Sequence, residues 1–81
     1  PAVPKNPVRV FPNPATDLLT IESPGKNWLA MDIYDSRGVL KETARETTGT
    51  KTLDISNWES GVYFVRIWFE NAIQAEKIIR K

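Results

Sequence analysis

Four aspartates are the residues of this chain whose chemistry best suits a metal site, because calcium prefers carboxylate oxygens. They are Asp17, Asp32, Asp35 and Asp54. Each lies near an expected turn or on a solvent-facing strand position, and the chain lacks the dense run of alternating acidic residues that forms a calcium loop. Two acids for glycoside hydrolysis would need a fixed separation across a cleft, which a domain this small hardly offers. Surface turns are the favoured interpretation, and we expect no metal or cofactor.

The chain has no histidine and no cysteine. Histidine is the commonest general base and neutral metal ligand, and cysteine supplies thiolate nucleophiles and zinc ligands. Their absence argues against hydrolase and transition-metal chemistry, so we do not expect an enzyme. With 11 basic and 10 acidic residues, the net charge is +1. That charge is too small to attract nucleic acid or an anionic membrane, and no apolar run approaches the roughly 20 residues of a membrane span.

An aromatic surface is the second candidate for a function. The residues that alternate away from the most apolar strand faces are Trp28, Tyr34, Phe64 and Trp68. On adjacent strands they would form an exposed platform that suits a sugar or a protein partner. The alternative is that loops cover both faces of a central strand, or that the register is shifted by one residue.

Short strands, in which apolar and polar residues alternate, must position any such surface. The expected strands are 8–11, 17–23, 28–35, 39–44, 51–55, 62–69 and 72–80. The residues expected to face inward are Leu19, Ile21, Leu29, Met31, Ile33, Leu53, Ile55, Tyr63, Val65, Ile67 and Phe69. About seven short strands with turns every 8 to 12 residues, and no helical spacing, predict an all-β fold, an antiparallel β-sandwich.

Proline and glycine mark the ends of these elements. Residues 1–7 hold three prolines and predict a linker before a domain at residues 8–81. The chain starts without methionine, so we expect a piece of a longer protein whose targeting segment lies upstream.

Two local patterns predict particular turns. Asp35 and Gly38 fit the first and fourth positions of a type I turn. Gly61 would permit a positive φ, and the Tyr63 hydroxyl would cap a backbone group at a corner, with Trp58 packed beneath it. Considered without the other segments, the basic residues at 77–81 indicate a charged edge strand that resists aggregation.

Four segments taken together resemble the C-terminal sorting domain (type A) of type IX secretion cargo from Bacteroidetes-type bacteria. The segments are 10–21, 33–38, 61–65 and 77–81. The residues that match the family motifs are Pro12, Asn13, Pro14, Asp35, Gly38, Gly61, Tyr63, Lys77, Arg80 and Lys81. Trp58 departs from the family, where an aliphatic residue is usual shortly before the glycine.

The resemblance implies an immunoglobulin-like sandwich of seven strands with a non-catalytic function. Such a domain directs its cargo through the periplasm and across the outer membrane to the cell surface or the medium. The implied partners are a shuttle protein, a sortase and the upstream cargo domain of the same chain, without nucleic acid or membrane insertion. Cleavage is implied upstream of the sandwich, at residues 1–7 or before them.

Edge contact by residues 72–81 is one way in which the secretion machinery could recognise the domain, since an edge strand offers unpaired backbone groups. Similar edges expose an isolated domain to strand-exchanged homodimers. The alternative function is a carbohydrate-binding or adhesive module that uses Trp28, Phe64 and Trp68.

Overall fold

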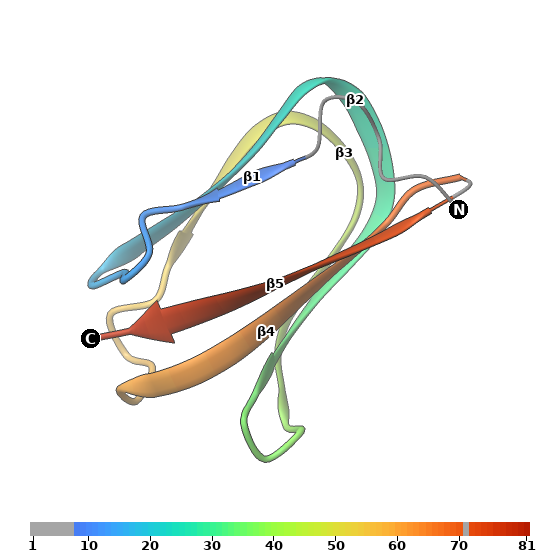
Figure 1. Cartoon of the computed structure of the whole chain (residues 1–81). Coiled ribbons are helices and arrows are strands. Elements are labelled where there is room, and N and C mark those ends of the chain that lie inside the picture. The colour runs from blue at the N-terminus through green and yellow to red at the C-terminus, as the bar shows by residue number, and fades with distance from the viewer. Residues whose placement is uncertain (1–7, 71) are drawn as a thin grey trace.

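The structure is a computed structural model that describes residues 8–70 and 72–81, apart from the side chains of residues 24–27 and 46–49. Within these residues the chain forms five strands (Figure 1): β1 (Arg9–Phe11), β2 (Leu18–Asp35), β3 (Leu40–Asp54), β4 (Gly61–Trp68) and β5 (Ile73–Arg80). None of the described residues forms a helix long and apolar enough to cross a membrane. The linker predicted at residues 1–7 lies outside the described residues.

The strands form two antiparallel layers because β2 and β3 bend together and contribute to both (Figure 1). The first layer holds β1, the start of β2 and the end of β3. The second layer holds the start of β3, the end of β2, β4 and β5. Seven strand segments of the described chain thus build the predicted sandwich, since β2 and β3 each supply two.

Bends in continuous strands replace the turn predicted at residues 23–27 and the loop predicted at 47–49. The β2–β3 pairing passes from Ser23↔Gly49 directly to Asn27↔Thr48, so three residues of β2 face no partner on β3. A bulge of this kind bends a strand without ending it and increases its twist. The chain therefore turns the corner between the layers while keeping most of its backbone pairing.

The core lies between the two layers, and most of the residues expected to face inward do so. Its buried residues are Val8, Ala15, Leu19, Ile21, Trp28, Met31, Ile33, Leu53, Ile55, Tyr63, Val65, Ile67 and Ile78. The prediction was wrong for Trp28 and Leu29, which are 1% and 47% exposed. Both follow the bulge directly, where the bend changes which side of the strand faces the interior. Trp28 therefore belongs to the core and not to an aromatic surface.

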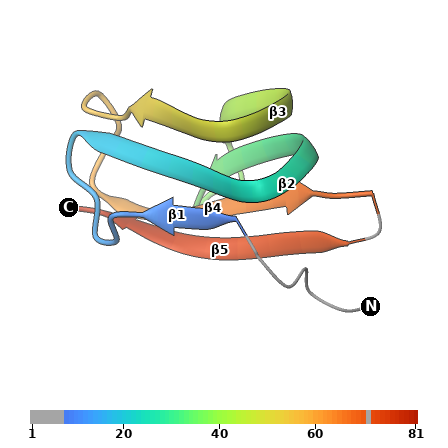
Figure 2. The same cartoon turned by 90° about the horizontal axis from the view of Figure 1, so that it is seen from above.

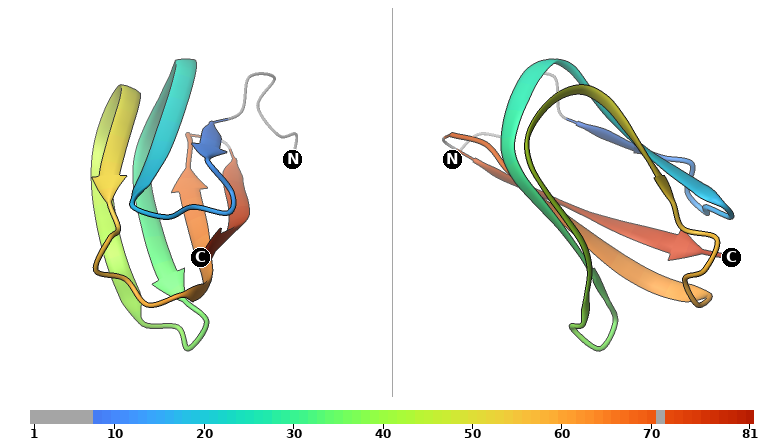
Figure 3. Two further views of the ribbon diagram at one scale, coloured as in Figure 1. Left: turned by 90° about the vertical axis from the view of Figure 1, so that its left-hand side faces the viewer. Right: turned by 180° about the vertical axis from the view of Figure 1, so that it is seen from behind.

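The side chain of Gln74 joins the two layers along one side of the sandwich. β1 and β5 lie on this side, whereas β3 lies on the other (Figures 2 and 3). Gln74 is 6% exposed; its Nε2 donates to the carbonyl oxygen of Val8 (2.7 Å), and its Oε1 accepts from the Val8 amide (3.0 Å). The amide side chain thus satisfies both backbone groups of a buried residue, which would otherwise be costly.

We predict that Gln74→Leu lowers the free energy of unfolding by about 1–3 kcal/mol, because it leaves the buried N–H and C=O of Val8 without partners. Urea denaturation measures the change. The control is Thr52→Ala at an exposed position, expected to stay within about 0.5 kcal/mol. A Gln74→Leu protein as stable as the parent would show that the bridge contributes nothing.

Candidate functional site

The ten residues singled out in the sequence gather in two adjoining clusters. The first, which we call the seam, joins residues 12–15 to the end of β5. The second, which we call the turn pocket, lies between the β2–β3 turn and the corner before β4. The clusters meet because Gly61 of the pocket pairs with Arg80 of the seam.

In the seam, Asn13 takes the place of a paired strand at the edge of β5. Its Nδ2 donates to the carbonyl oxygen of Lys77 (2.9 Å), and its Oδ1 accepts from the Ile79 amide (3.0 Å). Ala15 continues this pairing, because its amide donates to the Ile79 carbonyl (2.7 Å) and its carbonyl accepts from the Lys81 amide (2.8 Å). Two segments more than 60 residues apart in the sequence are therefore fastened together by four hydrogen bonds.

Pro12 and Pro14 flank this asparagine and are both exposed. The peptide bonds that precede them are cis. Neither proline has a backbone N–H, so neither can donate to a further strand placed alongside. The segment consequently ends the sheet at this side instead of extending it.

The seam restricts the edge contact expected for residues 72–81. The backbone groups of Lys77, Ile79 and Lys81 that point away from β4 already bond to Asn13 and Ala15. Because outward-pointing groups alternate along a strand, the part of this edge that no described residue occupies lies near Ile73 and Ala75. Strand addition at the far end of β5 would have to displace residues 13–15.

The three basic residues at the chain end have different environments. The Arg80 guanidinium donates to the carbonyl oxygens of Ser56 (3.0 Å) and Ile55 (3.4 Å), and also to that of Lys81. It thereby fixes the loop after β3 to the end of β5. Lys77 and Lys81 are exposed, and within the described part of the chain their side chains make no hydrogen bond or ion pair. The lysines are thus available to a partner, whereas the arginine is used internally.

In the turn pocket, the predicted turn at Asp35 to Gly38 is confirmed. The Gly38 amide donates to the Asp35 carbonyl (3.0 Å), and the Asp35 amide donates to the Val39 carbonyl (2.9 Å). Gly38 has a φ of +87°, a conformation that glycine adopts without strain. A three-residue hairpin loop that ends in a left-handed glycine fits this geometry.

The Asp35 carboxylate holds this turn in shape. Its Oδ1 accepts from the amides of Val39 (3.0 Å) and Arg37 (2.9 Å), and its Oδ2 pairs with the Arg37 guanidinium (2.9 Å). Hydrogen bonds from the Val39 amide and from Arg37 favour the ionised carboxylate, and they lower the pKa of Asp35 to about 2.

The corner before β4 is also as predicted. The Tyr63 hydroxyl donates to the carbonyl oxygen of Glu59 (2.5 Å), and its ring packs on partly buried Trp58 with centroids 4.9 Å apart. Burial raises the pKa of Tyr63, and the nearby carboxylates of Glu59 and Asp35 raise it further, so the hydroxyl stays a donor. Gly61 has a φ of +149°, again in the region that disfavours other residues.

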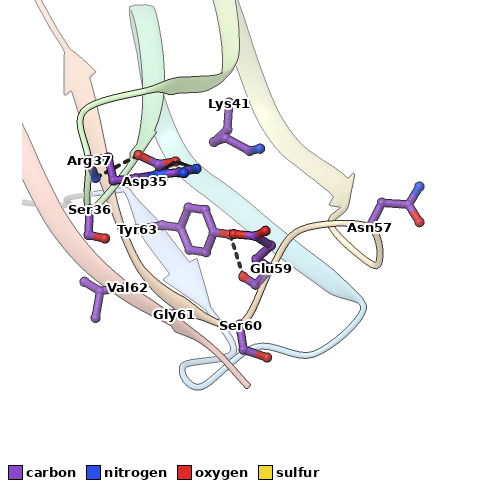
Figure 4. A pocket seen from close by; sticks show the side chains of 10 residues that line it. All are labelled: Asp35, Ser36, Arg37, Lys41, Asn57, Glu59, Ser60, Gly61, Val62 and Tyr63. Carbon is purple, nitrogen blue, oxygen red and sulfur yellow. Dashed lines mark hydrogen bonds and ion pairs between the residues drawn. The ribbon is translucent and has the colours of Figure 1, made fainter.

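A polar pocket of about 260 Å³ lies between the turn and the corner (Figure 4). Its lining residues are Asp35, Ser36, Arg37, Lys41, Asn57, Glu59, Ser60, Gly61, Val62 and Tyr63. Sequence reasoning missed Arg37, Lys41 and Glu59, because only the pairing of Asp35 with Tyr63 brings their segments together.

The four aspartates considered for calcium do not converge, and within the described residues no group of three or more acidic side chains could hold a metal. The arrangement offers charge and hydrogen bonds for recognition.

One protein family matches almost all of this chain. Its family model covers residues 9–81 and is described as the secretion system C-terminal sorting domain. No individual curated protein matches the chain at a significant level.

We predict that Asn13→Ala accelerates amide hydrogen exchange at Ile79 at least about tenfold, because that amide loses its acceptor at the sheet edge. NMR-detected exchange provides the residue-level measurement. The Val65 amide in the same layer serves as the internal control, and Thr16→Ala is the matched exposed substitution. Unchanged exchange at Ile79 would mean that the asparagine does not protect the edge.

We predict that Asp35→Asn removes part of the loss of stability at acid pH. The pKa of Asp35 is about 2 in the folded chain against an ordinary 3.8, so the unfolded state binds more protons between these values. The contribution of Asp35 is therefore full above about pH 4 and is lost as the pH falls to about 2. Thermal unfolding from pH 2 to 7 should show a shallower acid decline in Asp35→Asn and a lower Tm at pH 7, with Asp17→Asn as control. Parallel pH profiles for parent and variant would contradict this role.

Proposed function

Because the chain belongs to the family of secretion system C-terminal sorting domains, which are type IX secretion signals, we propose that it is read by a shuttle protein and a sortase that export its cargo. The family match over residues 9–81 is the observation that carries this proposal. Membership implies export across the outer membrane to the cell surface or beyond it. The cargo is the part of the protein that precedes this domain.

The secretion machinery recognises the folded domain and not a linear peptide. In support, the motif residues near positions 13 and 79 adjoin only through the hydrogen bonds of the seam. Asn13 and Arg80 use their polar atoms inside the domain, so they act by holding the seam together. Lys77 and Lys81 are exposed beside the seam and make the contacts to the partner.

Removal of the domain takes place within residues 1–7 or upstream of them. Val8 is 2% exposed and bonded to Gln74, and β1 begins at Arg9. A cut before Val8 therefore releases the cargo without breaking a strand of the sandwich.

The carbohydrate-binding alternative loses its main support. Trp28 is buried, and the Arg66 guanidinium stacks on the rings of Tyr34 (4.8 Å) and Trp68 (5.0 Å). A sugar would have to displace this cation to stack on either ring.

We predict that residues 1–81, fused behind a periplasmic reporter in a bacterium with type IX secretion, carry the reporter to the cell surface. The double variant Lys77→Gln and Lys81→Gln should reduce surface display at least about tenfold, because two contacts to the partner lose their charge. Protease accessibility of the reporter on intact cells measures the display.

The matched control removes two cations from the first layer, by Arg9→Gln and Lys51→Gln, and should retain display. Thermal unfolding must show that both double variants remain folded. A parent fusion that stays in the periplasm would refute the proposed function, whereas equal display of the two double variants would refute the role given to the lysines.

A further inference from the structure

The outer face of the second layer is an uncovered surface rich in apolar side chains. Of the large hydrophobic residues that the structure describes as exposed, four occupy outward positions in this layer: Leu40, Phe64, Ile73 and Ile79. The strand pairings place Leu40 next to Tyr34 and Tyr34 next to Phe64, while Ile73 pairs with Trp68 and Ile79 with Val62. No described segment lies over this side of β4 and β5 (Figure 1). Several exposed apolar side chains on one face are uncommon on a surface that only meets water.

Arg66 stands at the centre of this face and contacts three of its residues. Its guanidinium lies over the rings of Tyr34 and Trp68 and pairs with the Asp32 carboxylate (3.6 Å). Asp32 also accepts hydrogen bonds from the hydroxyls of Tyr34 (3.1 Å) and Thr43 (3.3 Å). These contacts restrict the conformations open to the Arg66 side chain, which reduces the entropy that it loses on binding.

The charge on this face favours an acidic partner. Asp32 is already engaged by three neighbours. The Arg66 side chain is 46% exposed, and Lys77, which pairs with Phe64 across the sheet, is exposed without an ion pair among the described residues. The cations therefore exceed the carboxylates, and complementary potentials guide protein partners to each other.

We propose that the outer face of the second layer docks onto a protein of the secretion apparatus that presents apolar side chains flanked by carboxylates. Phe64, Ile73 and Ile79 enter the apolar part of that surface, and Lys77 and Arg66 meet its carboxylates. The face continues the seam through Lys77 and Ile79, so one partner covers both. This inference rests on the proposed function and adds the surface and the chemistry of the partner.

The test compares two pairs of exposed hydrophobic residues in the reporter fusion of residues 1–81. The face pair, Phe64→Ser with Ile73→Ser, removes side chains that are 43% and 59% exposed. The control pair, Leu18→Ser with Val39→Ser, removes side chains that are 53% and 49% exposed outside this face. We expect surface display to fall at least about tenfold for the face pair and to stay within about twofold for the control pair. Thermal unfolding confirms that both remain folded.

A second arm tests the sign of the partner's charge. If carboxylates meet Lys77, Lys77→Glu lowers display further than Lys77→Gln, because it replaces a lost attraction by a repulsion. Equal display of these two variants would overturn the acidic part of the proposal.

The outcomes separate this inference from the proposed function. A parent fusion that is not exported refutes the proposed function and, with it, the inference. If the parent fusion is exported and the fusions with the face pair and with the control pair are displayed equally well, the inference alone is refuted.

Sedimentation of the isolated chain adds another measurement, since a dimer that the face pair dissociates would assign the face to a second copy. Binding to soluble dextran that the face pair abolishes would assign it to a glycan. Either result would overturn the proposal.

Discussion

The hydrogen bonds between residues 13–15 and the edge of β5 hold the two ends of the domain together. On the far side of the sandwich, continuous strands connect the layers, because β2 and β3 run through both. On the near side, among the described residues, hydrogen bonds of Asn13, Ala15 and Gln74 join the layers. The shape of the domain and the placement of its C-terminal lysines both depend on this seam.

The motif residues of the seam and the turn pocket fall into two groups, those that hold the fold together and those that are exposed on its surface. Asn13, Asp35, Tyr63 and Arg80 direct their polar atoms at backbone groups of the domain itself. Because a lost internal hydrogen bond weakens the fold, substitution of any of them would reduce the proposed recognition indirectly. The exposed lysines and the apolar outer face have no such internal role, so they are the surfaces on which partner contact can be separated from stability.

The sheet edges are protected by different means. The edge of β5 is closed at its end by residues 13–15, whose prolines cannot pair with another strand. In the described chain β3 pairs only with β2, so its other edge is open, but a bulge at Lys41 and the bend between the layers interrupt it. Bulges, bends and cations are common protections against edge-to-edge aggregation.

Local patterns in the sequence determined the alternation of inward and outward side chains from Val62 to Trp68, the turn at Asp35 to Gly38 and the Tyr63 corner. They also determined the family. These follow from period-two burial, from φ preferences and from contacts between residues close in the chain. Only the tertiary structure decided the burial of Trp28, because the preceding bulge changes the inward direction of β2. It also decided the partners of Asn13 and the turn pocket, because strand register joins distant residues that no local preference links. The different roles of Arg80 and the two lysines arise in the same way, since the pleat of β5 and the loop after β3 fix where each cation points.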